Sequence, residues 1–195
     1  MERTDEQIVP DHDVVLSNDA ILLRAFRLAD AEAIYEAVVE SKRELAAWLP
    51  WCHEKYTLAD TIEFLKGRAH AFQKDGEHGF LIIERATGRF VGATGINQID
   101  KAARRANLGY WLRTSATGRG YAATSTLMVA RWAFETLELE RIEIVVAVGN
   151  QPSQRVANRV GAIREGVARK RLRVGDAQHD AVIFSLVRDD VLNHE

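Results

Sequence analysis

The sequence predicts a single α/β (α+β) domain built around one sheet. Its 195 residues are 47% hydrophobic and 28% charged, a balance that suits one globular domain with a sizeable core. Segments with strand character are interspersed with segments of helical periodicity, roughly in the order β α α β β β α β α β β. A mixed order of this kind favours helices packed on a single sheet.

The N-terminal region is expected to contain a flexible arm followed by a hairpin. Residues 1–13 are polar and acidic and lack the apolar core of a signal peptide, so we assign the domain to 14–195. Two short apolar runs at 14–16 and 21–24 flank Ser-Asn-Asp, a composition typical of turns. No apolar run approaches the roughly 18 residues needed to span a bilayer.

Two helices are expected next. Asp30 can cap a helix over 31–41, whose apolar residues recur at helical spacing. After a proline that breaks any helix, Thr57 or Asp60 can begin a second helix that runs to about Lys74.

The rest of the chain predicts strands and two further helices. Three β-rich runs are separated by short polar links that favour antiparallel neighbours, and they lie at 80–83, 91–99 and 108–112. Helices are expected at 121–137 and 151–160, and further strands at 141–148, 162–174 and 179–187. Gly175-Asp176 supplies a hairpin turn between the last two strands.

A glycine-rich loop lies between the strand at 108–112 and the helix at 121–137. It reads Gly118-Arg119-Gly120. Glycines let a backbone approach a phosphate closely, and the free N–H groups and dipole of a first helical turn attract an anion. We therefore predict that the segment from Thr117 to Ala122 holds a phosphate-bearing ligand. The alternative is a surface turn in which the glycines only permit a tight bend.

The loop also matches the dinucleotide fingerprint G-x-G-x-x-A, since it reads GRGYAA. That fingerprint needs a βαβ unit with an acidic residue at the end of the second strand. Here Glu138 and Glu140 precede that strand, and Gly149 and Asn150 follow it. The segments before the loop are also meander-like, so the sequence argues against a dinucleotide site.

Several motifs in the right order resemble the GCN5-related N-acetyltransferases, and more closely their RimJ/RimL-type branch. The pyrophosphate loop of this family has the form Q/R-x-x-G-x-G/A, and Ser115 to Gly120 matches it except for the serine at the first position. The other similar stretches are ELAAWLPW at 44–51, LGYWLRTSATGRGYA at 108–122, NQPSQRVANRVGAIREG at 150–166 and HDAVIFSLVRD at 179–189. The resemblance covers about Ile21 to Val191.

The resemblance implies a mixed, mostly antiparallel sheet, flanked by helices, that splays between two parallel strands at 108–113 and 141–148. Acetyl-CoA would lie in this splay as a co-substrate, with its pantetheine arm on the first strand and its diphosphate on the glycine loop. No metal is expected, because the histidines have no ligand spacing. The implied cofactor-binding residues are Trp111, Leu112, Arg113, Thr117, Gly118, Arg119, Gly120, Tyr121, Ala122, Asn150 and Ser153.

The resemblance also implies catalytic residues. Many relatives read N-x-x-A-x-x-x-Y here, with the tyrosine as proton donor; Ala157 holds that position, and Ser153 follows Asn150 in the RimJ/RimL-like form N-x-x-S. Ser153 is the expected partner of the CoA thiolate and Asn150 a ligand or water contact, unless the two only cap a helix. A backbone N–H at a strand irregularity near Tyr110 or Trp111 would stabilise the oxyanion.

The sequence defines the general base less well. Relatives often carry a glutamate just before L-G-Y-W, where this chain has Asn107. The remaining candidates are Glu165, Glu84, His78 and His53, each with a solvated or structural role as the alternative. The enzyme can instead bind the neutral amine, which is easier for an α-amino group, with a pKa of about 8, than for lysine, with a pKa of about 10.

Trp48 and Trp51 flank Pro50 in the region that borders the acceptor in this branch, and they either wall the acceptor slot or fill the core. The expected function is acetyl transfer from acetyl-CoA to a primary amine, above all an N-terminal α-amino group of a protein or peptide. Two alternatives stay open. One is a small-amine N-acetyltransferase acting on a polyamine, amino acid or antibiotic, and the other is an inactive acetyl-CoA-binding sensor.

Charge and cysteine content limit the expected partners and compartment. A net charge of -2 predicts neither a nucleic-acid nor a membrane partner. The basic run at 164–173 is interpreted as a solvated face first, and as a contact for CoA phosphate or an acidic partner second. A single cysteine, Cys52, excludes an internal disulfide and fits a cytoplasmic protein. A homodimer is left open.

Overall fold

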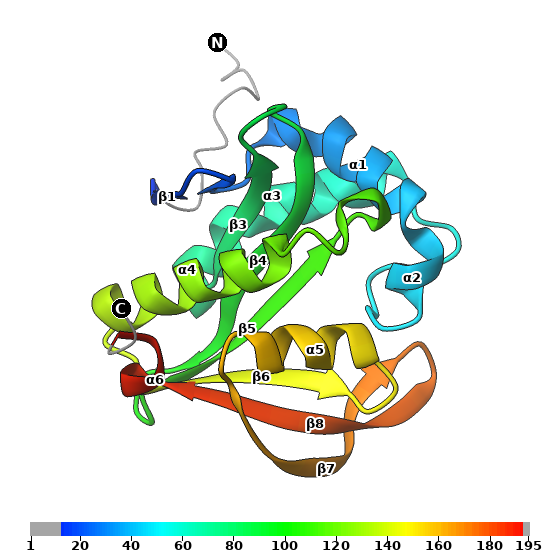
Figure 1. Ribbon diagram of the computed structural model, residues 1–195. Helices are drawn as coiled ribbons and strands as arrows, with labels where there is room; N and C mark the ends of the chain where they lie inside the picture. Colours follow the sequence, from blue (N-terminus) through cyan, green and yellow to red (C-terminus); the bar gives the residue numbers. More distant parts are fainter. Residues whose placement is uncertain (1–12, 193–195) are drawn as a thin grey trace.

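An eight-stranded mixed sheet forms the centre of the computed structural model, which describes residues 13–192 (Figure 1). The strands are β1 (Val15–Ser17), β2 (Ile21–Arg24), β3 (His78–Glu84), β4 (Phe90–Asp100), β5 (Arg105–Leu112), β6 (Arg141–Ala147), β7 (Ile163–Val174) and β8 (Ala177–Val187). Their spatial order is β1-β2-β3-β4-β5-β6-β8-β7, and all neighbours are antiparallel except β5 and β6. The predicted fold class is confirmed. The expected arm at 1–13 lies, apart from Asp13, outside the described residues.

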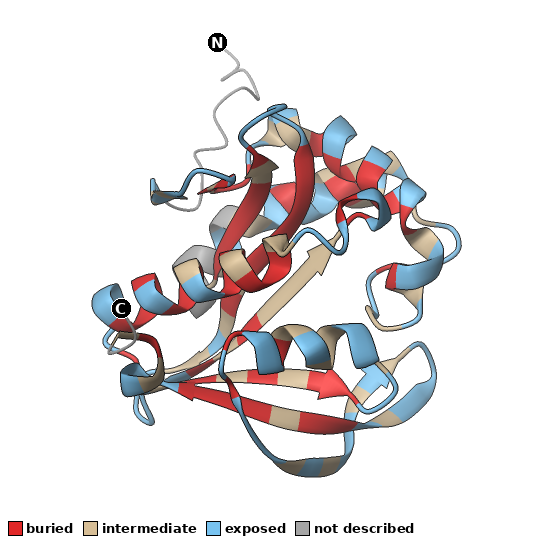
Figure 2. Ribbon diagram, viewed as in Figure 1, coloured by how far each residue is buried: buried red, intermediate tan, exposed pale blue. Residues whose placement is uncertain are grey.

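Helices cover both faces of the sheet. On one face lie α4 (Tyr121–Thr136), α5 (Gln151–Arg159) and α6 (Arg188–Leu192), and on the other α1 (Ala31–Glu40) and α3 (Leu58–Asp75). Alternate residues of β3 divide between the two cores, Phe80 and Ile82 toward α4 and Leu81 toward α1. The central strands accordingly carry mostly buried positions, while the outer sides of the helices are exposed (Figure 2).

Short helical segments complete the layers. They are η1 (Leu28–Asp30), α2 (Lys42–Ala46) and η2 (Thr114–Ala116), of which η1 and η2 are 3₁₀ turns. Neither α2 nor α6 is predicted from the sequence, because five residues are too few to show helical periodicity. Ser41 separates α1 from α2; it is buried, and its Oγ accepts a hydrogen bond from Thr114 N (2.8 Å). This bond ties the helical layer to the loop after β5.

The parallel pair β5–β6 is joined over only three residue pairs, the last of which is Asn107 with Glu143. Beyond it the two strands diverge (Figure 1). β4 stays paired with β5 as far as Leu112, and β8 stays paired with β6 as far as Ala147. The sheet therefore opens at one seam, and the predicted splay between parallel strands is confirmed.

An ion pair between the buried Arg113 and the exposed Glu40 fastens the end of β5 to α1. Arg113 is only 6% exposed; its Nε donates to Glu40 Oε2 (2.9 Å) and its Nη1 to Phe90 O (3.1 Å). The other oxygen of Glu40 accepts from Ser115 N in η2 (2.9 Å). These hydrogen bonds, chiefly those from Arg113, lower the pKa of Glu40 from 4.5 to about 2.

Replacing Glu40 by Gln should lower the free energy of unfolding by about 1–3 kcal/mol at neutral pH, because the buried guanidinium of Arg113 loses its counter-charge. The carboxylate stabilises the fold fully above its unfolded pKa, so the difference between wild type and variant should narrow as the pH falls from 4.5 toward 2. Chemical denaturation at about pH 7 and about pH 3.5 measures both effects. An equal difference at the two pH values would contradict the assignment.

Candidate active site

A cavity of about 690 Å³ opens where β5 and β6 diverge. Four parts of the chain line it: the end of β5, the loop that leads into α4, α2 with the residues after it, and one side of α5. The wall contains ten of the site residues predicted from sequence, namely Trp48, Tyr110, Trp111, Leu112, Thr117, Gly118, Gly120, Ala122, Asn150 and Ser153. The fold thus brings together three segments that are distant in the sequence.

The glycine loop forms one end of the cavity at the start of α4. Gly118 and Gly120 have φ angles of 78° and 83°, in the left-handed region that glycine adopts most easily. A Cβ at either position would meet no atom within 4 Å, so open space lies beside this backbone. The first helical bond of α4 runs from Thr124 N to Gly120 O (3.0 Å). The N–H groups of residues 121–123 therefore lack helical partners and can bind an anion.

The side chains of three predicted cofactor-binding residues lie outside the cavity wall. The buried side chain of Arg113 is held by its ion pair with Glu40. Arg119 Nη1 and Tyr121 OH both bond to Glu84 Oε1 on β3, at 3.1 and 2.5 Å. Hydrogen bonds from Thr87 and Tyr121, together with the charge of Arg119, lower the pKa of Glu84. The side chains of Arg119 and Tyr121 thus fix the glycine loop to the sheet, and the backbone N–H of Tyr121 is one of those without a helical partner.

β5 presents unpaired backbone groups to the open seam. Arg113 N donates to Val91 O on β4 (2.9 Å). Because backbone direction alternates along a strand, the N–H and C=O groups of Leu112 and Tyr110 point the other way, toward β6. β6 is no longer paired with β5 at this level. The edge is therefore available to a ligand with its own amide groups.

The prediction of a strand irregularity near Tyr110 or Trp111 is wrong. The β4–β5 register is unbroken through both residues, and its shift lies further back, between Asn97 and Asp100. A regular strand beside an open seam already exposes a backbone N–H at every second residue, so no irregularity is needed to present one.

Tyr110 and Ser153 form a hydroxyl pair across the opening. Tyr110 OH lies 3.0 Å from Ser153 Oγ and donates to Ser153 O (2.9 Å). Burial raises the pKa of Tyr110 to about 12, so the phenol stays protonated near neutral pH. Asn150 Oδ1 accepts from Ser153 N (3.2 Å) and caps α5. Asn150 and Ser153 therefore form the helix cap, and both also line the cavity.

Trp48 and Trp51 take different places. Trp48 lines the cavity and lies against Gly149, where a Cβ would be 2.9 Å from Trp48 Cη2. Trp51 is 40% exposed and packs on Trp111 with ring centroids 5.7 Å apart, but does not line the cavity itself. Cys52 is buried beside it, and this burial raises the pKa of its thiol. Trp48 borders the opening directly, and Trp51 supports it through Trp111.

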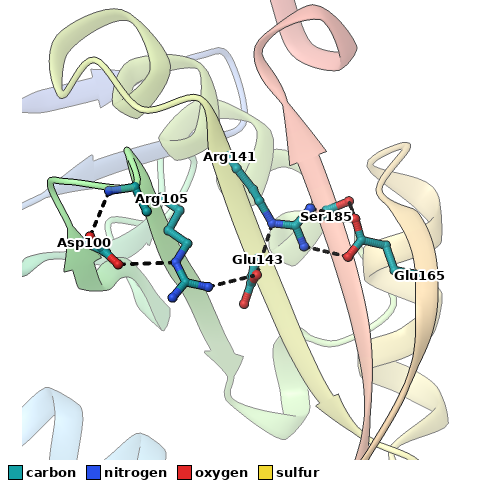
Figure 3. Close-up of polar contacts among 7 residues, drawn as sticks. Asp100, Arg105, Arg141, Glu143, Glu165 and Ser185 are labelled. Atoms are coloured by element: carbon teal, nitrogen blue, oxygen red, sulfur yellow. Dashed lines mark hydrogen bonds and ion pairs between the residues drawn. The ribbon is translucent and has the colours of Figure 1, made fainter.

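Glu165, one of the base candidates, belongs to an ion network at the closed end of the seam (Figure 3). Its oxygens accept two hydrogen bonds from Arg141 (2.6 Å each) and one from Ser185 Oγ (2.8 Å), which hold its pKa at about 2. Arg141 also bonds to Glu143, which lies 3.9 Å from Nη1 of Arg105. Glu165 is a charged structural group and does not line the cavity.

The other base candidates also lie outside the cavity wall. Glu84 is bound by the side chains at the start of α4. His78 and His53 pack against aromatic rings. Asn107, at the position where relatives often carry glutamate, donates from Nδ2 to Asn97 Oδ1 (2.9 Å). None of these groups can reach a substrate in the cavity directly.

Three charged residues in the wall were not predicted from the sequence. Glu44 on α2 is the one carboxylate lining the cavity in the described part of the chain, and its Oε2 accepts from Thr114 Oγ1 (3.3 Å). Arg155 and Arg159 come from one face of α5, and neither forms an ion pair with a side chain that the structure describes. Their four-residue spacing on a predicted helix is a signal that could have found them.

Among the side chains that the structure describes, which lie within 13–192 but exclude 69 and 72–75, no group of three or more His, Cys, Asp or Glu could hold a metal ion. None of the helices described in that range combines the length and the apolar character of a membrane span.

Comparisons with known proteins agree with this arrangement. The sequence model of one protein family, the acetyltransferase (GNAT) domain, matches residues 20–163 of this chain. A curated relative from Bacillus subtilis (strain 168), "Putative ribosomal N-acetyltransferase YdaF", is 32% identical over 174 residues, which cover 88% of this chain and 93% of that protein.

Two solved structures share the fold. RimJ of Mycobacterium smegmatis in complex with CoA-disulfide is 26% identical with a TM-score of 0.82, over 94% of this chain and 91% of that one. The microcin C7 self immunity acetyltransferase MccE, in complex with acetyl-CoA and AMP, is 25% identical with a TM-score of 0.81, over 87% of this chain and 93% of that one. From its sequence, its fold and its relatives, the chain belongs to the GNAT family of acetyl-CoA-dependent N-acetyltransferases.

Proposed function

We propose that this chain transfers the acetyl group of acetyl-CoA to the α-amino group at the N-terminus of a protein or peptide. The observation that carries the proposal is the Tyr110–Ser153 hydroxyl pair, which lies beside the unpaired backbone edge of β5. The acceptor class draws support from the relatives, since one is named a ribosomal N-acetyltransferase and another is RimJ.

The cavity offers distinct groups for each part of acetyl-CoA. The free N–H groups at the start of α4, with the left-handed glycines before them, suit the diphosphate. The backbone of Leu112 and Tyr110 suits the amides of the pantetheine arm, because an extended chain can pair with an open strand edge. Arg155 and Arg159 add positive charge from α5. The residues present therefore fit the whole length of the co-substrate.

The chain's own groups account for the proton and charge movements of acetyl transfer. As the amine nitrogen bonds to the acetyl carbon, the carbonyl oxygen gains charge that a backbone N–H of β5 near Tyr110 can stabilise. When the carbon–sulfur bond breaks, Ser153 Oγ gives a proton to the thiolate. Tyr110, protonated and 3.0 Å from Ser153 Oγ, can return a proton to the serine once its O–H turns from Ser153 O to Ser153 Oγ, and the resulting phenolate regains a proton from solvent.

The amine must reach the site without its extra proton. An α-amino group with a pKa of about 8 is about one quarter neutral at about pH 7.5, so binding of the neutral form needs no strong base. Once the neutral amine has bonded to the acetyl carbon, its nitrogen must lose one proton. Glu44 is the carboxylate that can accept this proton, since it lines the cavity. Trp48, packed on Gly149, walls the entrance through which the acceptor arrives.

A small amine is the second candidate acceptor. The observation that favours it is the similarity to MccE, a self immunity acetyltransferase whose structure holds AMP together with acetyl-CoA. The two candidates differ in what must follow the amine, because a peptide acceptor continues as a chain out of the cavity.

The acceptor class is tested by measuring CoA thiol release with three kinds of amine. Peptides with a free N-terminus should be turned over, while the same peptides with a blocked N-terminus and an internal lysine should react at least about tenfold more slowly, because the lysine amine is mostly charged. Polyamines serve as the small-amine comparison. Turnover of polyamines alone would establish the second candidate, and acetyl-CoA binding without any turnover would favour a sensor.

The hydroxyl pair is tested by a double-mutant cycle. Ser153→Ala should lower kcat by about 100-fold with little change in acetyl-CoA affinity, as for loss of a general acid, and Tyr110→Phe by about tenfold. The double variant should be no slower than Ser153→Ala, because Tyr110 acts through the serine. Asn158→Ala, on the exposed side of the same helix, is the control and should keep wild-type kcat. If Ser153→Ala lost stability but kept turnover per folded molecule, the serine would be only part of the helix cap.

A further inference from the structure

Three consecutive basic residues, Arg169, Lys170 and Arg171, form a bulge in the β7–β8 hairpin, here called the basic bulge. Between the residue pairs that flank it, these three residues of β7 lie opposite a single residue of β8, Asp180. Lys170 has a φ angle of 50°, which non-glycine residues rarely adopt. Its N–H donates to Asp180 Oδ1 (2.8 Å), which holds the bulge in this shape.

The basic bulge is exposed and unneutralised. None of its three side chains forms an ion pair in the described part of the chain. Asp180, the residue opposite the bulge, accepts a hydrogen bond from the backbone of Lys170, and Asp176 at the hairpin turn lies 3.5 Å from Arg173. The chain as a whole carries a net charge of -2, so this surface is a local excess of positive charge.

A short series of contacts leads from the basic bulge to the wall of the cavity. Val148 N, just after β6, donates to Asp180 O (3.0 Å), on the residue that faces the bulge. Gly149, which follows Val148 in the chain, lies against Trp48, and Trp48 lines the cavity. In Figure 1 the hairpin turn lies on the side of the sheet where β6 ends and α2 is found. The basic bulge is therefore connected to the part of the cavity wall that contains Trp48, through Asp180, Val148 and Gly149.

We propose that the basic bulge docks acidic residues that follow the acceptor amine in a polypeptide substrate. The proposal rests on the proposed function and adds the chemical class of its substrate: an N-terminus followed, some residues on, by Asp or Glu. An extended chain advances about 3.3–3.6 Å per residue, so residues beyond the entrance can reach the hairpin. Arginine side chains bind carboxylates in a bidentate manner, and a bulge re-aims side chains beside a functional site.

The observations favour an acidic polypeptide over a nucleic acid. The hairpin segment 168–179 contains no Phe, Tyr or Trp on which a base could stack, and the charge of the whole chain is negative. A polypeptide also fits the connection of the basic surface to the cavity wall, since the chain that carries the amine must continue out of the cavity.

The test compares kcat/KM for three peptides that share their first residues and differ further along, where each carries acidic, neutral or basic residues. For the wild type the acidic peptide should be preferred over the neutral one by about three- to tenfold, the effect of two exposed ion pairs, and salt should reduce the preference. In the Arg169→Gln, Arg171→Gln double variant the ratio should fall to about one. Lys170 is kept because its left-handed backbone is part of the bulge.

The matched control removes two charges elsewhere. Lys66→Gln with Lys101→Gln changes two exposed lysines away from the hairpin and should keep the wild-type ratio. Equal kcat/KM for all three peptides in the wild type, or an acidic preference that survives in the double variant, would overturn the proposal while leaving N-terminal acetylation intact. Failure to acetylate any peptide would instead contradict the proposed function. If the acidic preference were absent and single-stranded RNA bound the wild type but not the double variant, the surface would belong to a nucleic acid.

Discussion

The end of hydrogen bonding between β5 and β6 after Asn107 is the constraint on which the site depends. At the closed end the strands are held by the ion network around Arg141, which joins β6 to β7 through Glu165. Beyond it the backbone of β5 faces an opening, and backbone polar groups without partners are costly unless water or a ligand reaches them. The interrupted sheet is thus stable as a cavity, and a ligand with amides of its own can continue the ladder.

The second requirement is a glycine loop held in one place relative to that seam. Two carboxylates on different elements provide this: Glu40 on α1 binds Arg113 and the backbone of η2, and Glu84 on β3 binds Arg119 and Tyr121. Because both anchors form within the protein, the anion site at the start of α4 is already shaped before a ligand binds. Preorganisation of this kind lowers the ordering cost of binding. The two arginines therefore hold the loop in shape through ion pairs within the protein.

The sequence was sufficient to predict those helices, strands and site residues that have strong local signals. The Asn150–Ser153 spacing predicted both a helix cap and a site contact, and the structure contains the cap beside the cavity. The partners of Arg113 and of Arg119 could not be predicted, because they lie 73 and 35 residues away and no local pattern links them. Tyr110 was expected to act through its backbone, and its phenol reaches Ser153 only because α5 returns over the end of β5. Glu44 was not predicted, because the five residues of α2 are too few for a periodic pattern that would indicate which side of the helix is buried.

Binding of acetyl-CoA to two glycine variants tests the central claim most directly. Gly120 and Gly175 both have positive φ and open space where a Cβ would lie, but only Gly120 caps α4 at the cavity, while Gly175 lies in the hairpin turn. By calorimetric titration, Gly120→Glu should weaken acetyl-CoA binding by at least about 100-fold, or about 2.7 kcal/mol, because it places a negative side chain at the anion site. Gly175→Glu should bind like the wild type. Wild-type affinity in a folded Gly120→Glu variant would contradict the placement of the co-substrate in the open seam.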